Sequence, residues 1–399
     1  MYDVAVIGAG PAGSRVAYQL AARGYEVVVV EQKESLGEPV CCTGIISREC
    51  VTSFDIDGDV ILREVNSARV FSPSGKLLSL RRAQPQAYIV DRAAFNVALA
   101  RRAQAQGVDY ILNSPVRGMK VGNDNIRIEL ASYGGELKSL EARAGVIATG
   151  FGSKLVEGLG LGRVGDFVSG AQAEVETMAV DEVEVYLGQE LAPAFFAWLV
   201  PTSPQRALVG LLSRRSPGVY LRRLMSSLLA QGKIVSTEAG LSYGGIPLKP
   251  LARTYGDRLM VVGSAAGQVK PTSGGGIYYG LLCADMAADS LHQALKRDTL
   301  SAKNLANYER EWKRKLGREL KVGYWGRRFY ELLSDRQIDS IFGIIKSDGI
   351  DEALLKADDL SFDWHGQVIL RLIGHQALSR IFRAKKPPFP PQEKEGLII

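Results

Sequence analysis

The chain has 399 residues, of which 46% are hydrophobic and 23% are charged, and 49 Lys and Arg residues against 43 Asp and Glu residues make it mildly basic. This length allows two or three domains with substantial cores. No apolar run approaches the roughly 20 residues of a membrane span, and the first strand directly follows Met1, so we expect a cytoplasmic protein without a signal peptide. The 4 Cys and 3 His residues lack the spacing of a disulfide framework or zinc site, so we expect no metal ligand and chemistry supplied by a cofactor.

The N-terminus carries the most informative pattern. An apolar strand precedes Gly8-Ala9-Gly10-Pro11-Ala12-Gly13, a helix-like segment follows, and a second apolar strand ends at Glu31. Gly8 permits a tight turn, Gly10 lets the backbone approach a pyrophosphate, and Gly13 allows close packing of helix on strand. Glu31 would accept hydrogen bonds from ribose hydroxyls. The pattern predicts the first β-α-β unit of an adenine-dinucleotide site, and a glycine-rich turn without a ligand is the alternative.

The next segment predicts a loop, a hairpin and a helix. Residues 35–52, with the run Pro39-Val40-Cys41-Cys42-Thr43-Gly44, are rich enough in Pro and Gly to predict a loop. Polar turn residues between apolar runs predict a hairpin around 68–76. Asp91 is a plausible cap for a helix that ends near Gly107.

Three further apolar runs resemble strands that return to the nucleotide-binding sheet, at 108–115, 126–130 and 144–148. The last is followed by Thr149-Gly150-Phe151, and Gly150 at the carboxyl end of a strand suits close approach by a ligand.

Residues 167–248 predict a second sheet. Short strand patterns recur at 183–187, 195–200 and 207–212, with one helix around 220–231. An antiparallel sheet in a second domain is the economical interpretation.

The chain then returns to the first domain. A strand from 258 runs into a small-residue turn that contains Ser264, and Gly274-Gly275-Gly276-Ile277 opens a helical pattern to about Lys296. From residue 300 the pattern is helical and basic, and a Pro-rich segment follows at 386–391.

Three motifs carry a family resemblance. The runs 39–44, 192–201 and 271–277, together with the nucleotide fingerprint and the helix opened by Asp91-Arg92, resemble the geranylgeranyl reductase family. That family lies in the flavoprotein monooxygenase-like superfamily, whose members bind FAD. The resemblance covers about residues 1 to 300, and the helical C-terminus only in general character.

The resemblance implies a mixed α/β fold like that of p-hydroxybenzoate hydroxylase. It implies a Rossmann-like FAD-binding domain over 1–165 and 250–299, with a β insertion near 60–90. An antiparallel-sheet substrate domain would cover 166–249 and a helical C-terminal domain 300–385, with a flexible tail at 386–399.

Matching positions imply the residues around FAD. Arg92 would face the dinucleotide from the side, with an ordinary surface salt bridge as the alternative, and the helix N-terminus after Gly276 would stabilise negative charge on the reduced flavin. Most relatives have an Asp after Gly263, where this chain has Ser264, and one lost contact of this kind costs about 1 to 3 kcal/mol. The cofactor residues are Gly8, Gly10, Ala12, Gly13, Glu31, Cys42, Thr43, Gly44, Arg92, Gly150, Ser264, Gly274, Gly275, Gly276 and Ile277.

The catalytic and substrate residues are less constrained. Cys42 matches a family cysteine near the flavin and is our candidate for a redox or proton-donating group, with a buried inert thiol as the alternative. Phe196 and Trp198 share a face by period two and could line a long apolar pocket, as could Tyr278. Ordinary core packing is the alternative for all three aromatic residues.

The implied activity is reduction of isoprenoid C=C bonds in a lipid or prenyl diphosphate precursor, by hydride from reduced flavin N5. An aromatic hydroxylase and a quinone-linked or electron-transfer flavoprotein are the alternatives. The external donor would be NAD(P)H or a reduced electron-carrier protein. The basic and aromatic residues of 312–330 indicate either peripheral contact with anionic lipid or a solvated face over a core-facing aromatic stripe. We expect no nucleic acid among the partners.

Overall fold

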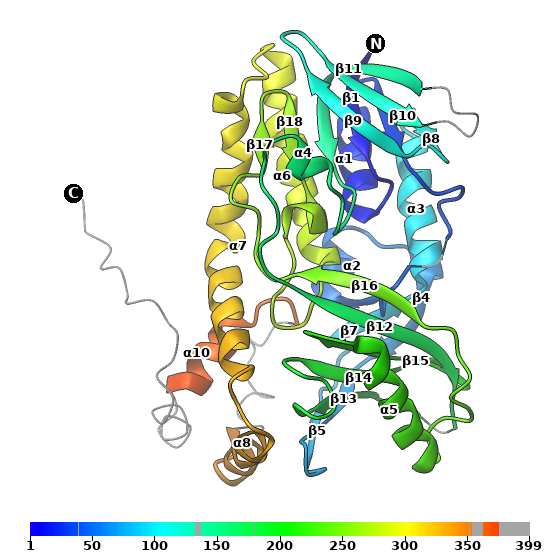
Figure 1. Cartoon of the computed structure of the whole chain (residues 1–399), viewed down its shortest axis with the longest axis vertical. Coiled ribbons are helices and arrows are strands. Elements are labelled where there is room, and N and C mark those ends of the chain that lie inside the picture. Colours follow the sequence, from blue (N-terminus) through cyan, green and yellow to red (C-terminus); the bar gives the residue numbers. More distant parts are fainter. Residues whose placement is uncertain (39, 132–136, 179, 351, 353–361, 375–399) are drawn as a thin grey trace, which may run out of the picture.

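The computed structural model describes residues 1–38, 40–131, 137–178, 180–350, 352 and 362–374. Within them, the first of two large sheets has the order β17-β18-β11-β1-β2-β8, and β10 and β9 continue it from β11 (Figure 1). Strands β11, β1, β2 and β18 run parallel to their neighbours in the centre. The strands are β1 (Tyr2–Ile7), β2 (Val27–Val30), β8 (Asp109–Ile111), β9 (Val116–Val121), β10 (Ile126–Ala131), β11 (Leu137–Ile147), β17 (Tyr255–Gly256) and β18 (Leu259–Val261).

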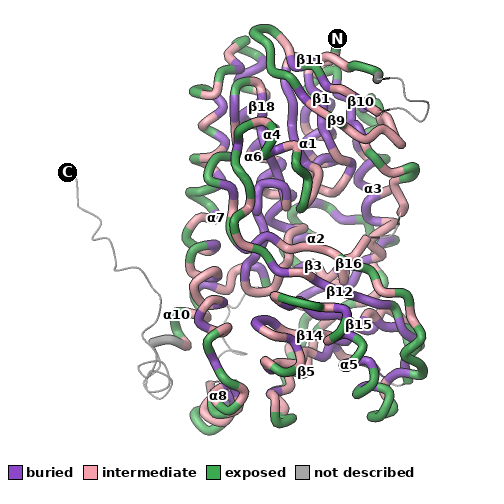
Figure 2. The backbone as a smooth tube through the Cα atoms, viewed as in Figure 1, coloured by how far each residue is buried: buried purple, intermediate pink, exposed green. Residues whose placement is uncertain are grey.

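Helices cover one face of this sheet, and the central strands are buried on both faces (Figure 2). This is why β2 is a continuous run of four valines rather than an alternating pattern. Helix α1 (Pro11–Ala21) packs between α3 (Arg92–Gln104) and α6 (Ile277–Lys296). Asp91 caps α3 as predicted, because its carboxylate accepts from the backbone N–H groups of Ala93 and Ala94.

The second sheet has the order β16-β12-β15-β14-β13-β5-β6, and most neighbours are antiparallel. Helix α5 (Pro217–Ala230) covers one face. Along β14, Ala197 and Leu199 face α5, whereas Phe196 and Trp198 face the opposite side, as the period of two predicts. The strands are β5 (Ser67–Phe71), β6 (Leu77–Arg81), β12 (Phe167–Glu176), β13 (Val183–Leu187), β14 (Phe196–Ser203), β15 (Arg206–Ser213) and β16 (Ser242–Pro247).

The hairpin expected near 68–76 forms as β5 and β6, and β5 also pairs in parallel with β13, so the hairpin extends the second sheet. One local expectation needs correction. Residues 35–52 are not loop throughout, since Ile45–Ser47 forms β3 and Ser47 caps α2 (Arg48–Ser53) by accepting from the Cys50 N–H. Strand β3 joins β4 (Ile61–Val65) and β7 (Ala87–Val90) in a three-stranded sheet. Two short 3-10 helices are η1 (Gly58–Val60) and η2 (Gly263–Ala266).

The C-terminal region is helical where it is described. Helix α7 (Ala302–Tyr330) runs along both large sheets (Figure 1), and α8 (Asp335–Ser347) and α10 (Gly366–Gly374) follow. Among the described residues, no helix is both long and apolar enough to cross a bilayer. The expected tail at 386–399 lies outside the described residues.

The aromatic and basic residues of α7 do not form one solvated set. Trp312 and Phe329 are buried, as the core-facing alternative requires. Arg327 is also buried, donates to the Ala194 carbonyl at 2.9 Å and pairs with Glu331 at 2.7 Å. Burial lowers the pKa of Arg327 to about 10. Arg327 is therefore not one of the exposed basic residues of α7 that could contact lipid headgroups.

A short segment before α10 packs against the loop at 270–275. Lys270 Nζ lies 2.6 Å from Asp363 Oδ1, and both side chains are buried. Thr272 Oγ1 lies 2.5 Å from His365 Nδ1, and the Tyr279 hydroxyl donates to the Asp363 carbonyl at 2.8 Å. These contacts hold the C-terminal segment on the start of α6.

Because His365 takes part in this contact, we expect the free energy of unfolding to depend on pH. Burial, followed by the charge of Lys270, lowers the pKa of His365 to about 4, whereas an unfolded His has a pKa of roughly 6.5. Between these values the unfolded chain binds the proton first, so the free energy of unfolding should fall by up to about 1.4 kcal/mol per pH unit on acidification. Urea unfolding of His365→Asn should lose this part of the slope, and His292→Asn should keep it. Identical slopes for the two variants would contradict the prediction.

Candidate active site

The turn after β1 has the geometry of a phosphate-binding turn. Gly8 has φ of +107°, and a Cβ there would lie 2.6 Å from the Ala148 carbonyl oxygen. A Cβ on Gly13 would lie 2.0 Å from the Gly8 carbonyl oxygen, so helix α1 sits directly on the turn. A Cβ on Gly10 would meet nothing within 4 Å. Gly8 and Gly13 are thus required by packing, and Gly10 leaves space for a ligand.

Glu31 follows β2 and braces the same turn. Its Oε2 accepts from the Ala9 N–H at 2.7 Å and its Oε1 from the Lys33 N–H at 3.1 Å. A carboxylate has about four acceptor positions, so both oxygens keep capacity for ribose hydroxyls.

The guanidinium group of Arg92 is a positive charge that no acidic side chain of the described residues pairs with. Its Nε and Nη1 are buried and have no hydrogen-bond partner among the residues that the structure describes, and its guanidinium carbon lies 5.1 Å from the Phe95 ring centroid. Gly44 packs on it, because a Cβ there would lie 3.1 Å from Arg92 Cγ. Leaving buried donors unpaired is costly, and a bound pyrophosphate would pair them. The surface salt bridge considered as an alternative is absent for this side chain within the described chain.

Three other predicted cofactor residues lie close together at the start of α1 and α6. They are Ala12, Ser264 and Gly276. A Cβ on Gly263 would lie 3.1 Å from Ala12 Cβ, and one on Gly276 would lie 3.4 Å from Ser264 Oγ. Helix α6 begins at Ile277 and has no side-chain N-cap. Its first N–H groups and the positive end of its dipole thus remain suited to an anionic group.

The second sheet closes the site through three consecutive positions of β16. A Cβ on Gly244 would lie 3.5 Å from Cys41 Sγ, and one on Gly245 would lie 2.3 Å from the Phe151 ring. The Cβ position of Gly274 lies 3.6 Å from Ile246 Cγ2. The cysteine loop, the turn that follows Gly150 and the triple glycine therefore meet at one strand. The sequence interpretation missed Gly244 and Gly245, although two glycines inside a strand often mark close approach by another segment.

The cysteine loop is partly buried. Cys42, like Thr43, is half-buried, and its carbonyl accepts from Gln172 Nε2 at 3.4 Å. Burial raises the pKa of the neighbouring Cys41 thiol, which also hydrogen-bonds Ser242. Both thiols are free, and Pro39 lies outside the described residues. The role of Cys42 stays a prediction.

The aromatic face of β14 reaches this junction. Phe196 and Trp198 contact each other edge to face at a centroid distance of 6.0 Å. They belong to an apolar cluster with Leu212 and Ile246, the two side chains nearest to the Cβ position of Gly274. The Trp198 Nε1 is buried without a hydrogen-bond partner in the described part of the chain. An apolar wall thus adjoins residues 270–276, the triple-glycine loop, which contains Gly274, Gly275 and Gly276.

Tyr278 is not brought to that wall. Its hydroxyl donates to Glu49, and its ring packs against Phe54 and Trp364 in the core of the first sheet. Of the three predicted pocket residues, Tyr278 is the one that lies away from this wall, because the first turn of α6 directs it towards α2. Its role in the site stays a prediction.

The fold is that of a dinucleotide-dependent oxidoreductase, and most of the predicted cofactor residues lie where its two large sheets meet. The family model described as lycopene cyclase protein matches residues 3–341. A digeranylgeranylglycerophospholipid reductase of Methanocaldococcus jannaschii is 30% identical over 88% of this chain and 93% of its own.

Solved structures agree. A geranylgeranyl bacteriochlorophyll reductase-like protein of Thermoplasma acidophilum aligns with a TM-score of 0.84 at 25% identity, covering 96% of this chain and 98% of its own. A flavin-dependent brominase aligns with a TM-score of 0.69 at 18% identity, covering 96% of this chain and 98% of its own, and shares the fold. The chain belongs to the geranylgeranyl reductase family of FAD-dependent oxidoreductases. The fold class and the family predicted from the sequence are confirmed.

Ser264 allows a direct test of the departure from the family. Ser264→Asp restores the acid that the resemblance implies, beside the uncapped start of α6. We expect FAD to bind about 5- to 150-fold more tightly, because one such contact contributes about 1 to 3 kcal/mol. Isothermal titration of the apoprotein measures this, with Ser264→Asn as the neutral control of similar size. Weaker binding by Ser264→Asp would mean that the position does not face the cofactor.

Proposed function

We propose that the protein reduces isoprenoid C=C bonds of a lipid or prenyl diphosphate precursor with bound FAD. The observation that carries the proposal is the aromatic face of Phe196 and Trp198, which adjoins the triple-glycine loop through Leu212 and Ile246. An isolated alkene has no polar group to grip, so a site for it needs an apolar wall close to the cofactor.

The residues fit FAD in a defined orientation. The open space at Gly10 and the unpaired guanidinium of Arg92 would hold the pyrophosphate, and Glu31 the adenosine ribose. Ser264 and the start of α6 would lie towards the flavin end. When bound and reduced, FAD supplies a hydride for the double bond.

The chain itself would position the alkene and provide a proton. Phe196 and Trp198 would exclude water and hold the isoprenoid chain. Cys42 is the proposed proton donor, because its loop reaches the same strand, β16, as the triple glycine does. The external donor would be NAD(P)H or a reduced electron-carrier protein, and the lipid would arrive from a membrane that the protein contacts peripherally.

A variant pair tests the apolar wall. Phe196→Ala should lower kcat/KM for a geranylgeranyl lipid by about 10- to 150-fold, since burying one Phe side chain contributes about 1.5 to 3 kcal/mol. Phe71→Ala, which removes another half-buried aromatic ring of the same sheet, should leave kcat/KM unchanged. Both variants should bind FAD normally. Equal loss in the two variants would assign Phe196 to the core.

One preparation separates the competing functions. The absorption spectrum of the purified protein should show flavin, and mass analysis of what co-purifies should show an isoprenoid lipid. Rapid NAD(P)H oxidation with peroxide release or hydroxylated aromatic product would instead indicate the hydroxylase. Flavin reduction by an electron carrier without turnover of any alkene would indicate an electron-transfer flavoprotein.

A further inference from the structure

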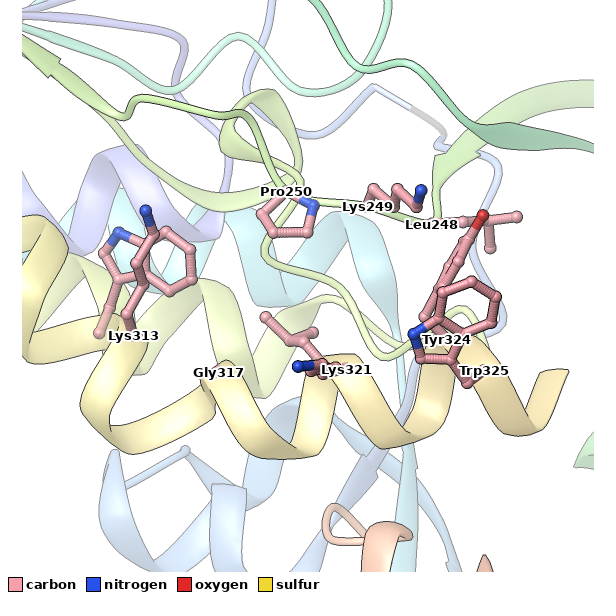
Figure 3. Close-up of a pocket in the computed structure, with 10 residues that line it drawn as sticks. Leu248, Lys249, Pro250, Lys313, Gly317, Lys321, Tyr324 and Trp325 are labelled. Atoms are coloured by element: carbon pink, nitrogen blue, oxygen red, sulfur yellow. The ribbon is translucent and has the colours of Figure 1, made fainter. Parts of the chain in front are cut away.

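A groove of about 390 Å³ lies between α7 and the turn at 248–250, outside the proposed active site (Figure 3). Its walls are apolar and aromatic, with Pro250, Leu320, Tyr324 and Trp325 among them. Its size falls within the range of small-ligand sites. Its apolar lining would suit an occupant with an apolar part.

Three lysines line the same groove, Lys249, Lys313 and Lys321. Lys313 pairs with Glu309 at 2.6 Å. Lys249 Nζ lies 4.4 Å from the Tyr324 ring centroid, and neither it nor Lys321 has a carboxylate within ion-pair distance among the described residues. The groove thus keeps two uncompensated positive charges.

Among the described residues, no acid of α7 lies within ion-pair distance of Lys249 or Lys321, and each of these acids has another partner. Glu309 accepts from the Thr254 N–H at 2.8 Å, besides its pair with Lys313. Glu311 pairs with Arg314 at 2.5 Å, and Glu319 accepts from the backbone N–H of His365 at 2.6 Å. The occupant is therefore expected to be anionic as well as apolar.

The groove is close to the proposed lipid site. Leu248 lines the groove and belongs to the apolar cluster of Phe196 and Trp198. Tyr324 also lines the groove and packs against that cluster. Next to Tyr324, a Cβ on Gly323 would lie 3.4 Å from both Pro271 and Thr272 of the triple-glycine loop. Helix α7 thus connects the groove with the triple-glycine loop through direct packing.

We propose that this lysine-lined groove is where the protein docks on an anionic phospholipid bilayer. Lys249 and Lys321 bind lipid phosphates, and the groove takes up the apolar part of a lipid beside Tyr324 and Trp325. Trp and Tyr favour the headgroup level, and lysine stems cover apolar surface while their charges stay in water. The identity of the occupant as a lipid surface rests on the proposed function, whereas its anionic and apolar character rests on the groove.

Vesicle binding tests the charges. The protein should bind phosphatidylglycerol vesicles more tightly than phosphatidylcholine vesicles, and salt should weaken this binding. Lys249→Gln/Lys321→Gln should bind the anionic vesicles about 30-fold less tightly, because each basic residue near the surface contributes about 1 kcal/mol. Lys120→Gln/Lys346→Gln removes the same charge from β9 and α8 and should bind nearly as the unaltered protein does.

A second variant tests the groove itself. Gly317 lines it, and a Cβ there would meet only Lys313 Cβ at 3.8 Å. Gly317→Leu should fill the groove without loss of stability, since Gly is unfavourable inside a helix. We expect weaker vesicle binding at unchanged charge. Anionic vesicles should shift the tryptophan emission of the unaltered protein to the blue, and Gly317→Leu should reduce this shift.

Several results would overturn the proposal. They are equal binding of the unaltered protein to neutral and anionic vesicles, and unchanged vesicle binding by either groove variant. Loss of reduction by an acidic electron-carrier protein, with vesicle binding intact, would identify a protein-docking surface instead. Alkene reduction in detergent is measured in parallel and should persist in all variants. Its absence from the unaltered protein would count against the proposed function and leave the vesicle result standing.

Discussion

Gly10→Val is expected to weaken FAD binding by at least about 100-fold while the protein stays folded. A Cβ at Gly10 meets nothing within 4 Å, and the residue has φ of −69°, so valine fits the ligand-free backbone. Its side chain would occupy the space through which a pyrophosphate approaches the N–H groups of the turn. Loss of two charge-assisted hydrogen bonds, each contributing about 1.5 to 3 kcal/mol, accounts for the magnitude.

Two other glycines provide the controls for this variant. Gly58→Val also places its Cβ in open space, at η1, and should bind FAD normally. Gly13→Val should fail to fold, because its Cβ would lie 2.0 Å from the Gly8 carbonyl oxygen. Urea unfolding and titration with FAD separate the two kinds of failure. Normal FAD affinity in a folded Gly10→Val protein would contradict the assignment of this turn to the pyrophosphate.

Asp363→Ala is expected to lower the free energy of unfolding by about 3 to 5 kcal/mol. The side chains of Lys270 and Asp363 are 6% and 1% exposed, and their charged atoms are 2.6 Å apart. Without the carboxylate, the Lys270 ammonium keeps a hydrogen bond to the Phe362 carbonyl at 3.2 Å, but it loses its buried counter-ion. Urea unfolding measures the loss, and Lys270→Met/Asp363→Leu should recover most of it, because two apolar side chains leave no buried charge.

The matched control is an exposed ion pair. Arg127 and Glu141 lie 2.7 Å apart with side chains 59% and 36% exposed. Arg127→Ala should cost less than about 1 kcal/mol. If Asp363→Ala lowered the free energy of unfolding no more than this control does, the buried pair would not anchor the C-terminal segment on the loop at 270–275.

The parts of the fold that depend on local sequence could be predicted. The first β-α-β unit, the Asp91 cap and the alternation along β14 each follow from residues within a few positions of one another. Their signals are turn geometry, capping chemistry and period, which act over short distances.

The parts of the fold that depend on contacts between distant residues could not be predicted from the sequence. Strand β5 joins β13 in parallel, and no local pattern selects that neighbour. The Lys270–Asp363 pair joins positions 93 residues apart. Tyr278 follows the triple glycine in sequence, but the turn of α6 directs its hydroxyl to Glu49. The domain boundaries and the roles of the site residues stay predictions.

The most direct test of the central claim is a single turnover without oxygen. The protein is reduced chemically under nitrogen and mixed with a digeranylgeranyl glycerophospholipid in detergent, and the lipid is analysed by mass spectrometry. We predict that flavin reoxidation accompanies the gain of two hydrogens per double bond, with one double bond reduced per reduced flavin. Flavin that stays reduced, with no mass gain in lipids of several headgroups, would contradict the assignment.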